Sequence, residues 1–185
     1  KIAAGEVVER PASVVKELLE NAIDAGARRI AVTINDGGRT LIRVSDDGHG
    51  IPADEVPLAF AQHATSKLRN PDDLFAITTL GFRGEALASI ASVSHATLLT
   101  RAAGAQTAVR VEVKDSRIGP AVPCAGSQGT TIEVRDLFYS VPARRKFLRT
   151  DATEFSHIHE MVLRSALPHP EVAFSLSHNG RATLD

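Results

Sequence analysis

Three polar side chains lie in a segment whose apolar residues recur at helical spacing. Glu17, Asn21 and Asp24 stand at i, i+4 and i+7, which places them along one line of a helix. A carboxylate such as Glu17 can take a proton from a water molecule, and the carbonyl oxygen of Asn21 is a hard ligand suited to Mg²⁺. The alternative is a solvated helix face, to which Lys16 and Glu20 would also belong.

A second candidate site follows the next apolar stretch, where Asp46 precedes Gly48 and Gly50. The glycines let backbone approach a flat ligand, and the carboxylate can accept a hydrogen bond from an amino group such as N6 of adenine. The alternative is an ordinary turn, because Asp and Gly both favour turns for local reasons.

A third candidate is a glycine-punctuated segment that leads into an expected helix and comprises Gly81, Phe82, Arg83 and Gly84. Free backbone N–H groups and the positive end of a helix can hold phosphate oxygens. Neither GxxxxGK(S/T) nor GxGxxG occurs in the chain, which disfavours the two commonest nucleotide-binding folds. The alternative is a flexible turn.

A fourth feature is a run of four cations within six residues: Arg144, Arg145, Lys146 and Arg149. Such a run can meet DNA phosphates. The alternative is a solvated face that Asp151 and Glu154 partly neutralise.

The hydrophobic pattern predicts the elements that must position these side chains. A buried stripe at three- and four-residue spacing predicts a helix over residues 11–25, ended by Gly26. Alternation over residues 30–34 and 41–44, with Asp36, Gly37 and Gly38 between them, predicts a β-hairpin.

Further elements follow along the rest of the chain. We expect helices over residues 54–62, 71–77, 85–91, 143–147 and 154–167, strands over 96–100, 109–113, 131–134 and 172–176, and an exposed connection over 119–129. Hairpin signals outnumber crossovers, which indicates an α+β fold with a mainly antiparallel sheet covered by helices. No repeat or linker divides the 185 residues, so we expect residues 1–185 to form a single domain.

Composition excludes several classes of protein. The chain has 43% hydrophobic and 23% charged residues and a net charge of −1, so any binding to DNA or a membrane must come from a local patch. One cysteine, Cys124, excludes a disulfide scaffold or a zinc ribbon. No apolar run approaches the roughly 20 residues of a membrane-spanning helix.

Taken in order, the motifs resemble those of the Bergerat-type (GHKL) ATPases, which comprise gyrase, Hsp90, the sensor histidine kinases and MutL. The shared set is a Glu-x-x-x-Asn helix, a strand ending Asp-x-Gly-x-Gly, a glycine-rich loop, and Gly129 with Thr130 before a strand. Within this group the chain is most similar to the MutL family of DNA mismatch-repair ATPases. The strings that carry the similarity are residues 2–8, 10–18, 21, 24–26, 63–67, 80–87, 138–139 and 142–148.

The resemblance implies a two-layer sandwich, with a mainly antiparallel mixed sheet, helices on one face, and ATP bound between the helices and a lid. It implies that Glu17 activates the attacking water, that Asn21 holds Mg²⁺ and that Asp24 acts through water. Asp46 and Thr130 would recognise adenine, and Gly48 and Gly50 would allow its close approach. The lid residues would be Thr65, Ser66, Lys67, Gly81, Phe82, Arg83 and Gly84.

The resemblance also implies a slow ATPase that serves as a switch in DNA mismatch repair. Mg²⁺ and ATP would order the lid and drive dimerisation with a second copy. The implied partners are a mismatch-recognition protein of the MutS type and DNA, in the bacterial cytoplasm or, in a eukaryote, the nucleus.

We expect the chain to be a fragment of a longer protein, without the family's following domain and C-terminal dimerisation domain. That following domain supplies a lysine to the γ-phosphate, so the fragment should bind ATP but hydrolyse it slowly or not at all. Two alternatives stay open, a nucleotide-gated interaction module without significant hydrolysis and a DNA-binding module that uses the four cations.

Overall fold

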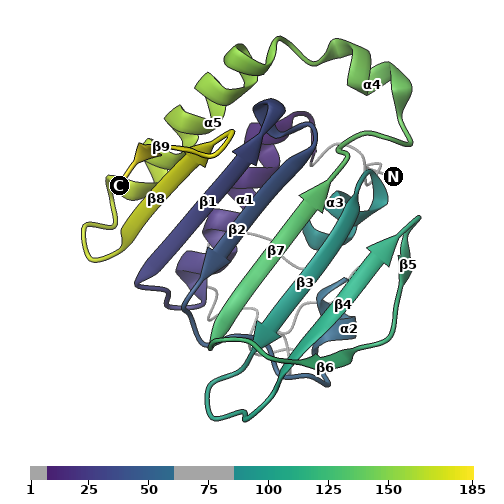
Figure 1. Cartoon of the computed structure of the whole chain (residues 1–185), viewed down its shortest axis with the longest axis vertical. Coiled ribbons are helices and arrows are strands. Elements are labelled where there is room, and N and C mark those ends of the chain that lie inside the picture. Colours follow the sequence, from purple (N-terminus) through teal and green to yellow (C-terminus); the bar gives the residue numbers. More distant parts are fainter. Residues whose placement is uncertain (1–7, 61–85) are drawn as a thin grey trace, which may run out of the picture.

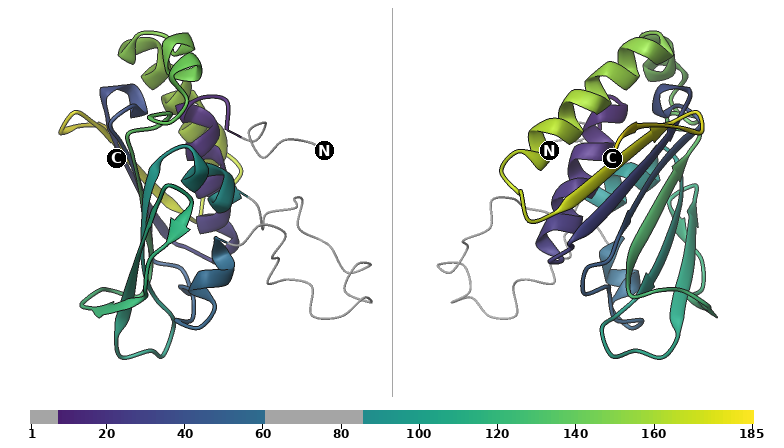
Figure 2. Two further views of the ribbon diagram at one scale, coloured as in Figure 1. Left: turned by 90° about the vertical axis from the view of Figure 1, so that its right-hand side faces the viewer. Right: turned by 60° about the vertical axis from the view of Figure 1, so that its left-hand side comes forward.

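One mixed β-sheet carries helices on one of its faces, as Figures 1 and 2 show. The computed structural model describes residues 8–60 and 86–185. Its elements are α1 (Pro11–Asp24), β1 (Arg29–Asn35), the 3-10 helix η1 (Asp36–Gly38), β2 (Leu41–Asp46), α2 (Val56–Ala59), α3 (Ala86–Ser92), β3 (His95–Arg101), β4 (Ala108–Lys114), β5 (Arg117–Ile118), β6 (Val122–Cys124), β7 (Gly129–Arg135), α4 (Pro142–Phe147), α5 (Asp151–Ala166), β8 (Ala173–His178) and β9 (Arg181–Leu184).

The strands lie in the order β5-β4-β3-β7-β2-β1-β8-β9, with β6 also paired to β4. Every pairing in the described part of the chain is antiparallel except that of β1 with β8, in which Arg29 lies opposite Ala173. The mainly antiparallel α+β class predicted from the hairpin signals is therefore confirmed.

Helix α1 forms where its buried stripe predicts it. Val14, Val15, Leu18 and Leu19 are at most 2% exposed, and burying each such side chain contributes roughly 1.5–3 kcal/mol. The helix ends at Asp24, and Gly26 takes a left-handed φ of 70° that a residue with a Cβ rarely adopts. Packing against β2 and α5 holds α1 on the helix-bearing face of the sheet (Figure 2).

The two faces of the sheet differ in chemistry. Ile30, Val32 and Ile34 stand at alternate positions of β1 and are buried beneath the helices. No described helix covers the opposite face (Figure 2). Arg43 of β2, at a position that alternates with the buried Ile42 and Val44, pairs with Glu133 of β7 at 2.6 Å. An antiparallel sheet with one packed and one polar face explains the alternating sequence pattern.

Some expected elements differ from the observed ones. Within the described residues, the helix expected over 54–62 is the four-residue α2, and the expected connection over 119–129 contains the short strand β6. Two- and three-residue strands such as β5 and β6 carry too little alternation to be detected in a sequence. The helix and loops expected over residues 63–84 lie outside the described residues. No helix in the described part of the chain is long and apolar enough to cross a membrane.

Candidate active site

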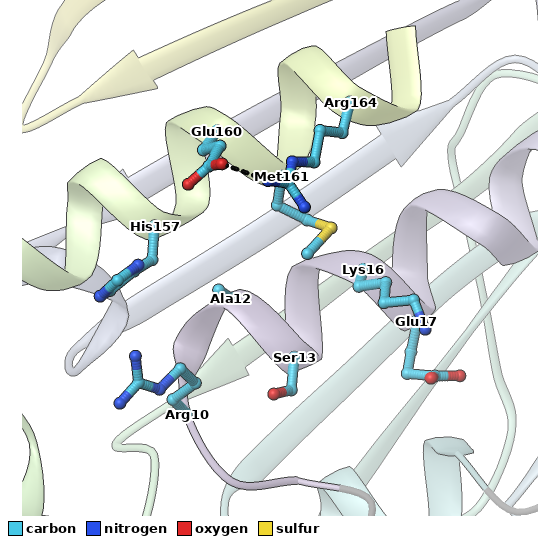
Figure 3. A pocket seen from close by; sticks show the side chains of 9 residues that line it. All are labelled: Arg10, Ala12, Ser13, Lys16, Glu17, His157, Glu160, Met161 and Arg164. Atoms are coloured by element: carbon cyan, nitrogen blue, oxygen red, sulfur yellow. Dashed lines mark hydrogen bonds and ion pairs between the residues drawn. The ribbon is translucent and has the colours of Figure 1, made fainter. Parts of the chain in front are cut away.

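Helix α1 carries the first candidate line. Glu17 and Asn21 are half-buried, whereas Asp24 in the last turn is exposed. In Figure 3 the side chains of Ser13 and Glu17, one helical turn apart, leave the same side of α1. Asn21 continues this line by one further turn, because residues at i and i+4 share a helix face.

The turn after β2 is fastened to the end of α1. The backbone N–H of His49 donates to the carbonyl oxygen of Ala25 at 2.9 Å. Gly48 packs so closely on the same residue that an added Cβ would lie 2.6 Å from the Ala25 oxygen. The structure therefore brings the Asp46 turn and the last turn of α1 together, with Glu17 about 12 Å from Ala25 along the axis at about 1.5 Å per residue.

Asp46 is a partly buried hydrogen-bond acceptor. Its Oδ1 accepts the backbone N–H of Gly48 at 2.8 Å. Burial raises the pKa of the Asp46 carboxyl, and the backbone amides of Gly48 and Thr130 offset part of that rise. A carboxylate kept from full hydration in this way gains by accepting a hydrogen bond from a ligand.

Asp47, the next residue, has a structural role. Its Oδ1 accepts the backbone N–H groups of Arg28 and Arg29 at 2.8 Å each, and its Oδ2 accepts Arg29 Nε at 3.0 Å. Burial acts to raise the pKa of this carboxyl, but these hydrogen bonds and the Arg29 charge outweigh it and lower the pKa. Asp46 and Asp47 therefore have opposite pKa shifts in consecutive positions.

Three neighbouring strands place Asp46, Thr130 and Thr100 in one row. Asp46 of β2 lies opposite Thr130 of β7, and Thr130 lies opposite Thr100 of β3. Thr130 and Thr100 are 9% and 1% exposed, and their hydroxyl oxygens are 3.0 Å apart. The row lies at one end of these strands, on the face that the helices cover.

Thr100 belongs to this row although no motif identified it. The sequence signal was available, because Thr100 continues the core-facing positions Ala96 and Leu98 of β3 with a polar residue. A buried hydroxyl at such a position needs hydrogen-bond partners, and identifying them required the strand register.

Two glycines are required by the packing of the chain itself. A Cβ at Gly50 would overlap the carbonyl oxygen of Arg101, and one at Gly129 would overlap that of Asp46. Gly129 also has a φ of 113°, which an L side chain rarely adopts. Gly50 and Gly129 therefore let the ends of β2, β3 and β7 approach closely. This packing requires glycine at both positions whether or not a ligand binds.

The lid residues predicted from the sequence lie outside the described residues: Thr65, Ser66, Lys67, Gly81, Phe82, Arg83 and Gly84. Residues 8–60 and 86–185 hold no group of three or more His, Cys, Asp or Glu that could bind a metal ion. Mg²⁺ commonly binds through one or two protein groups together with substrate phosphates. The half-buried Asn21 fits that smaller requirement.

A hollow of about 290 Å³ lies between α1 and α5 (Figure 3). Charges of both signs line it, and Glu160 and Arg164 of α5 pair along one side of it at 2.6 Å. Glu17 lines the other side, so the hollow adjoins the N-terminal half of α1, at the opposite end of the helix from the Asp46 turn.

The cationic segment forms α4 and the link to α5. Arg145, Lys146 and Arg149 are exposed, whereas Arg144 is half-buried and donates to the carbonyl oxygen of Val8 at 3.0 Å. Phe147 is 84% exposed among them. Figure 1 shows α4 at one end of the molecule, beyond the sheet.

Asp151 and Glu154, which were expected to neutralise these cations in part, make contacts at the start of α5. Asp151 pairs instead with Arg39 at 3.1 Å. Glu154 is fully buried, and its Oε1 accepts the backbone N–H of Arg149 at 2.8 Å. Both acids therefore have contacts that hold the start of α5 in place.

Comparisons with known proteins show which family the chain resembles. A family model described as histidine kinase-, DNA gyrase B- and HSP90-like ATPase matches residues 9–123. The DNA mismatch repair protein MutL of Pseudomonas paraeruginosa is 59% identical over 182 residues, which cover 98% of this chain and 29% of that protein. MutL of Xylella fastidiosa is 56% identical over 181 residues, with the same two coverages.

Two similar solved structures also come from DNA repair proteins. The Aquifex aeolicus MutL ATPase domain complexed with ADP has a TM-score of 0.76 and 37% identity, over 96% of this chain and 63% of that one. A structure of the N-terminal domain of a DNA repair protein has a TM-score of 0.83 and 28% identity, over 99% and 54%.

The chain belongs to the histidine kinase-, DNA gyrase B- and HSP90-like ATPase family. Within that family its sequence and fold are MutL-like. It spans about 29% of the length of the curated relatives that it matches.

Proposed function

We propose that this domain binds Mg²⁺ and ATP along α1 and hydrolyses ATP slowly. The observation that carries the proposal is the hydrogen bond between His49 and Ala25, which joins the Asp46 turn to the helix bearing Asn21 and Glu17. In this arrangement the adenine lies at Asp46 and Thr130, and the phosphates extend toward Glu17. The ADP complex of the similar Aquifex aeolicus domain supports a nucleotide as the ligand.

Each residue on α1 has a distinct chemical role in the proposal. The half-buried Glu17 accepts a proton from the attacking water and orients it. Asn21 holds Mg²⁺ through its amide oxygen, and Asp24 contributes through water. The bound ion supplies positive charge to the phosphate oxygens. Phosphoryl transfer depends mostly on positioning and charge stabilisation, which suits a site with few reactive groups.

The proposal extends to a switch in DNA mismatch repair. The lid at residues 65–67 and 81–84 orders on the phosphates, and the ordered state favours dimerisation with a second copy and coupling to a mismatch-recognition protein of the MutS type. Support comes from the MutL identity of the two relatives compared above, which are bacterial. We also propose a cytoplasmic location, because these two relatives are bacterial proteins.

The first test is calorimetric titration of the chain with Mg²⁺ and a non-hydrolysable ATP analogue. We expect saturable binding by the unmodified chain and loss of binding in Asp46→Asn, because the amide presents a donor to the adenine amino group. Asp47→Asn is the matched control, since Asp47 bonds to Arg28 and Arg29 and should leave binding intact. Equal affinity in Asp46→Asn and the unmodified chain would contradict the adenine site.

A second function is favoured by the exposed cations beside Phe147. We propose that Arg145, Lys146 and Arg149 contact DNA phosphates, with Arg144 holding α4 against the segment before α1. Because the net charge of the chain is −1, this contact is local and weak. Binding that is insensitive to salt or to replacement of these cations would exclude it.

A further inference from the structure

The hydroxyl of Thr100 has three hydrogen-bonding neighbours and a single hydrogen to share among them. The backbone N–H of Ile51 donates to Thr100 Oγ1 at 2.9 Å. The carbonyl oxygen of Gly129 lies 3.1 Å away, and Thr130 Oγ1 lies 3.0 Å away. A threonine hydroxyl offers one donor and two acceptor positions.

Only one arrangement of hydrogens makes all three contacts hydrogen bonds at once. The carbonyl oxygen of Gly129 can only accept, so the Thr100 hydrogen points to it. Ile51 occupies one lone pair of Thr100, which leaves one lone pair for Thr130. Thr130 therefore donates its own hydrogen to Thr100 across the 3.0 Å contact. Thr100 is 1% exposed and Thr130 is 9% exposed, so the contact between them lies at the inner side of the row.

These hydrogen-bond directions determine what Thr130 can offer to a bound ligand. With its hydrogen committed to Thr100, Thr130 offers only lone pairs to any other group. Asp46, its neighbour across β2 and β7, also offers only acceptors when it is ionised. Two adjacent acceptors suit a 6-amino group, whose two hydrogens can both be donated, whereas a 6-oxo group in the same place would face both acceptors with lone pairs.

We infer that Thr100 is a positioning residue that turns the Thr130 hydroxyl hydrogen away from the nucleotide, so that the site selects a 6-amino purine over a 6-oxo purine. The inference rests on the proposed function, because it assumes that the base lies at Asp46 and Thr130. It adds a residue outside every motif of the sequence and a reason for base selectivity.

The test compares the affinities of ADP and IDP in the presence of Mg²⁺. ADP carries a 6-amino group beside an N1 that accepts, and IDP carries a 6-oxo group beside an N1 that donates. The unmodified chain should prefer ADP. In Thr100→Val the Thr130 hydrogen loses its acceptor and becomes free to donate to the 6-oxo group. The ADP-to-IDP affinity ratio should then fall about tenfold, the size of one hydrogen bond. Thr100→Ser, which keeps the hydroxyl, should restore the ratio.

A matched control exists on the other face of the same strands. Thr131 of β7 bonds to Ser45 of β2 through their hydroxyls at 2.7 Å. Thr131→Val removes a cross-strand hydroxyl contact of the same kind and should leave the affinity ratio unchanged. A loss of affinity for ADP and IDP by the same factor in Thr100→Val would overturn the inference, because it would indicate a purely structural role.

A measurement on the unmodified chain covers the case in which Thr100→Val does not fold. Proton NMR should show a slowly exchanging Thr130 hydroxyl hydrogen close to Thr100, with the same contact after ADP is added. Transfer of that contact to the nucleotide would refute the inference. Binding of neither ADP nor IDP by the unmodified chain would refute the proposed function and this inference with it, whereas binding with an unaltered ratio in Thr100→Val refutes the inference alone.

Discussion

The row of Asp46, Thr130 and Thr100 and the cationic segment at α4 are organised in opposite ways. Asp46, Thr130 and Thr100 lie in adjacent strands, and the two threonines are joined by a buried hydrogen bond. Arg145 and Lys146 lie on a six-residue helix and extend into solvent. One region is specified by its neighbours in the fold, and the other by charge in the local sequence.

This difference indicates which region should determine ligand specificity and which should tolerate substitutions. A buried row allows one arrangement of donors and acceptors, because any unsatisfied group costs about 1–3 kcal/mol. Exposed cations contribute little to stability and act through their combined field. Substitutions should therefore affect folding and base selectivity at the first region, and salt-dependent binding at the second.

The largest expected effect is the loss of stability in Gly129→Ala, directly before Thr130 of the row. The added Cβ would overlap the Asp46 carbonyl oxygen at a φ of 113°, so we expect a loss of roughly 3 kcal/mol or more, or failure to fold. Gly180→Ala is the control, because its φ of 77° is also left-handed but nothing lies within 4 Å of its Cβ position. Denaturant unfolding measures both, and similar losses would show that close packing at Gly129 is unimportant.

The next effect is the pH dependence of nucleotide binding. Asp46 must be ionised to accept a hydrogen bond from the adenine amino group, and burial raises its pKa. ADP affinity should therefore fall as the pH decreases through that pKa, beginning above the pH at which an ordinary aspartate is protonated. Calorimetry across about pH 7 to 4 measures this fall. Asp46→Asn should show no binding anywhere in this range, and an ADP affinity that does not fall with decreasing pH in the unmodified chain would contradict the role of Asp46.

The two adjacent carboxylates should respond differently when stability is measured. Asp47→Asn removes bonds to Arg28 and Arg29 and should lower the free energy of unfolding by about 1 kcal/mol at neutral pH. The pKa of Asp47 is lowered in the folded state, so its contribution is present above the unfolded-state pKa and is lost as pH falls through the folded value.

Asp46→Asn should keep or slightly increase stability at neutral pH, since it removes a charge whose burial raises the pKa. Thermal unfolding of both variants at neutral pH checks the contrast. A larger destabilisation in Asp46→Asn than in Asp47→Asn would reverse the assignment of site residue and structural residue.

The smallest effect on stability should come from the cationic segment. Lys146→Glu should change the free energy of unfolding by less than about 0.5 kcal/mol, because the side chain is exposed. DNA binding should weaken, and the slope of log affinity against log salt should decrease by about one. Filter binding at several salt concentrations tests this, with Lys114→Glu at an exposed position of β4 as the control. Equal effects of the two changes would show that α4 is not the contact.

The sequence predicted those features that depend on local periodicity. Helix α1 and the hairpin of β1 and β2 agree with their patterns, because each buries one regular face. Short strands such as β5 and β6 were missed, since two or three residues show no period.

The candidate site was predictable only as far as its motifs extend. Asp46 was identified from its turn, but Thr100 was not, because its role depends on pairing with a strand 30 residues away along the chain. Glu154 was taken as a surface acid, whereas it is buried beneath the start of α5 and accepts from Arg149. Tertiary contacts decided both cases.

The parallel pairing of β1 with β8 has a consequence for how the domain is made. The edge of β1 that faces away from β2 pairs with β8, and Arg29 lies opposite Ala173. This pairing can form only after residues 173–178 have been synthesised and have left the ribosome. Closing such a long loop is slow, because its entropy is lost before the contact forms. During synthesis, β1 and β2 therefore present an open strand edge, and the nascent domain should depend on chaperones until β8 arrives.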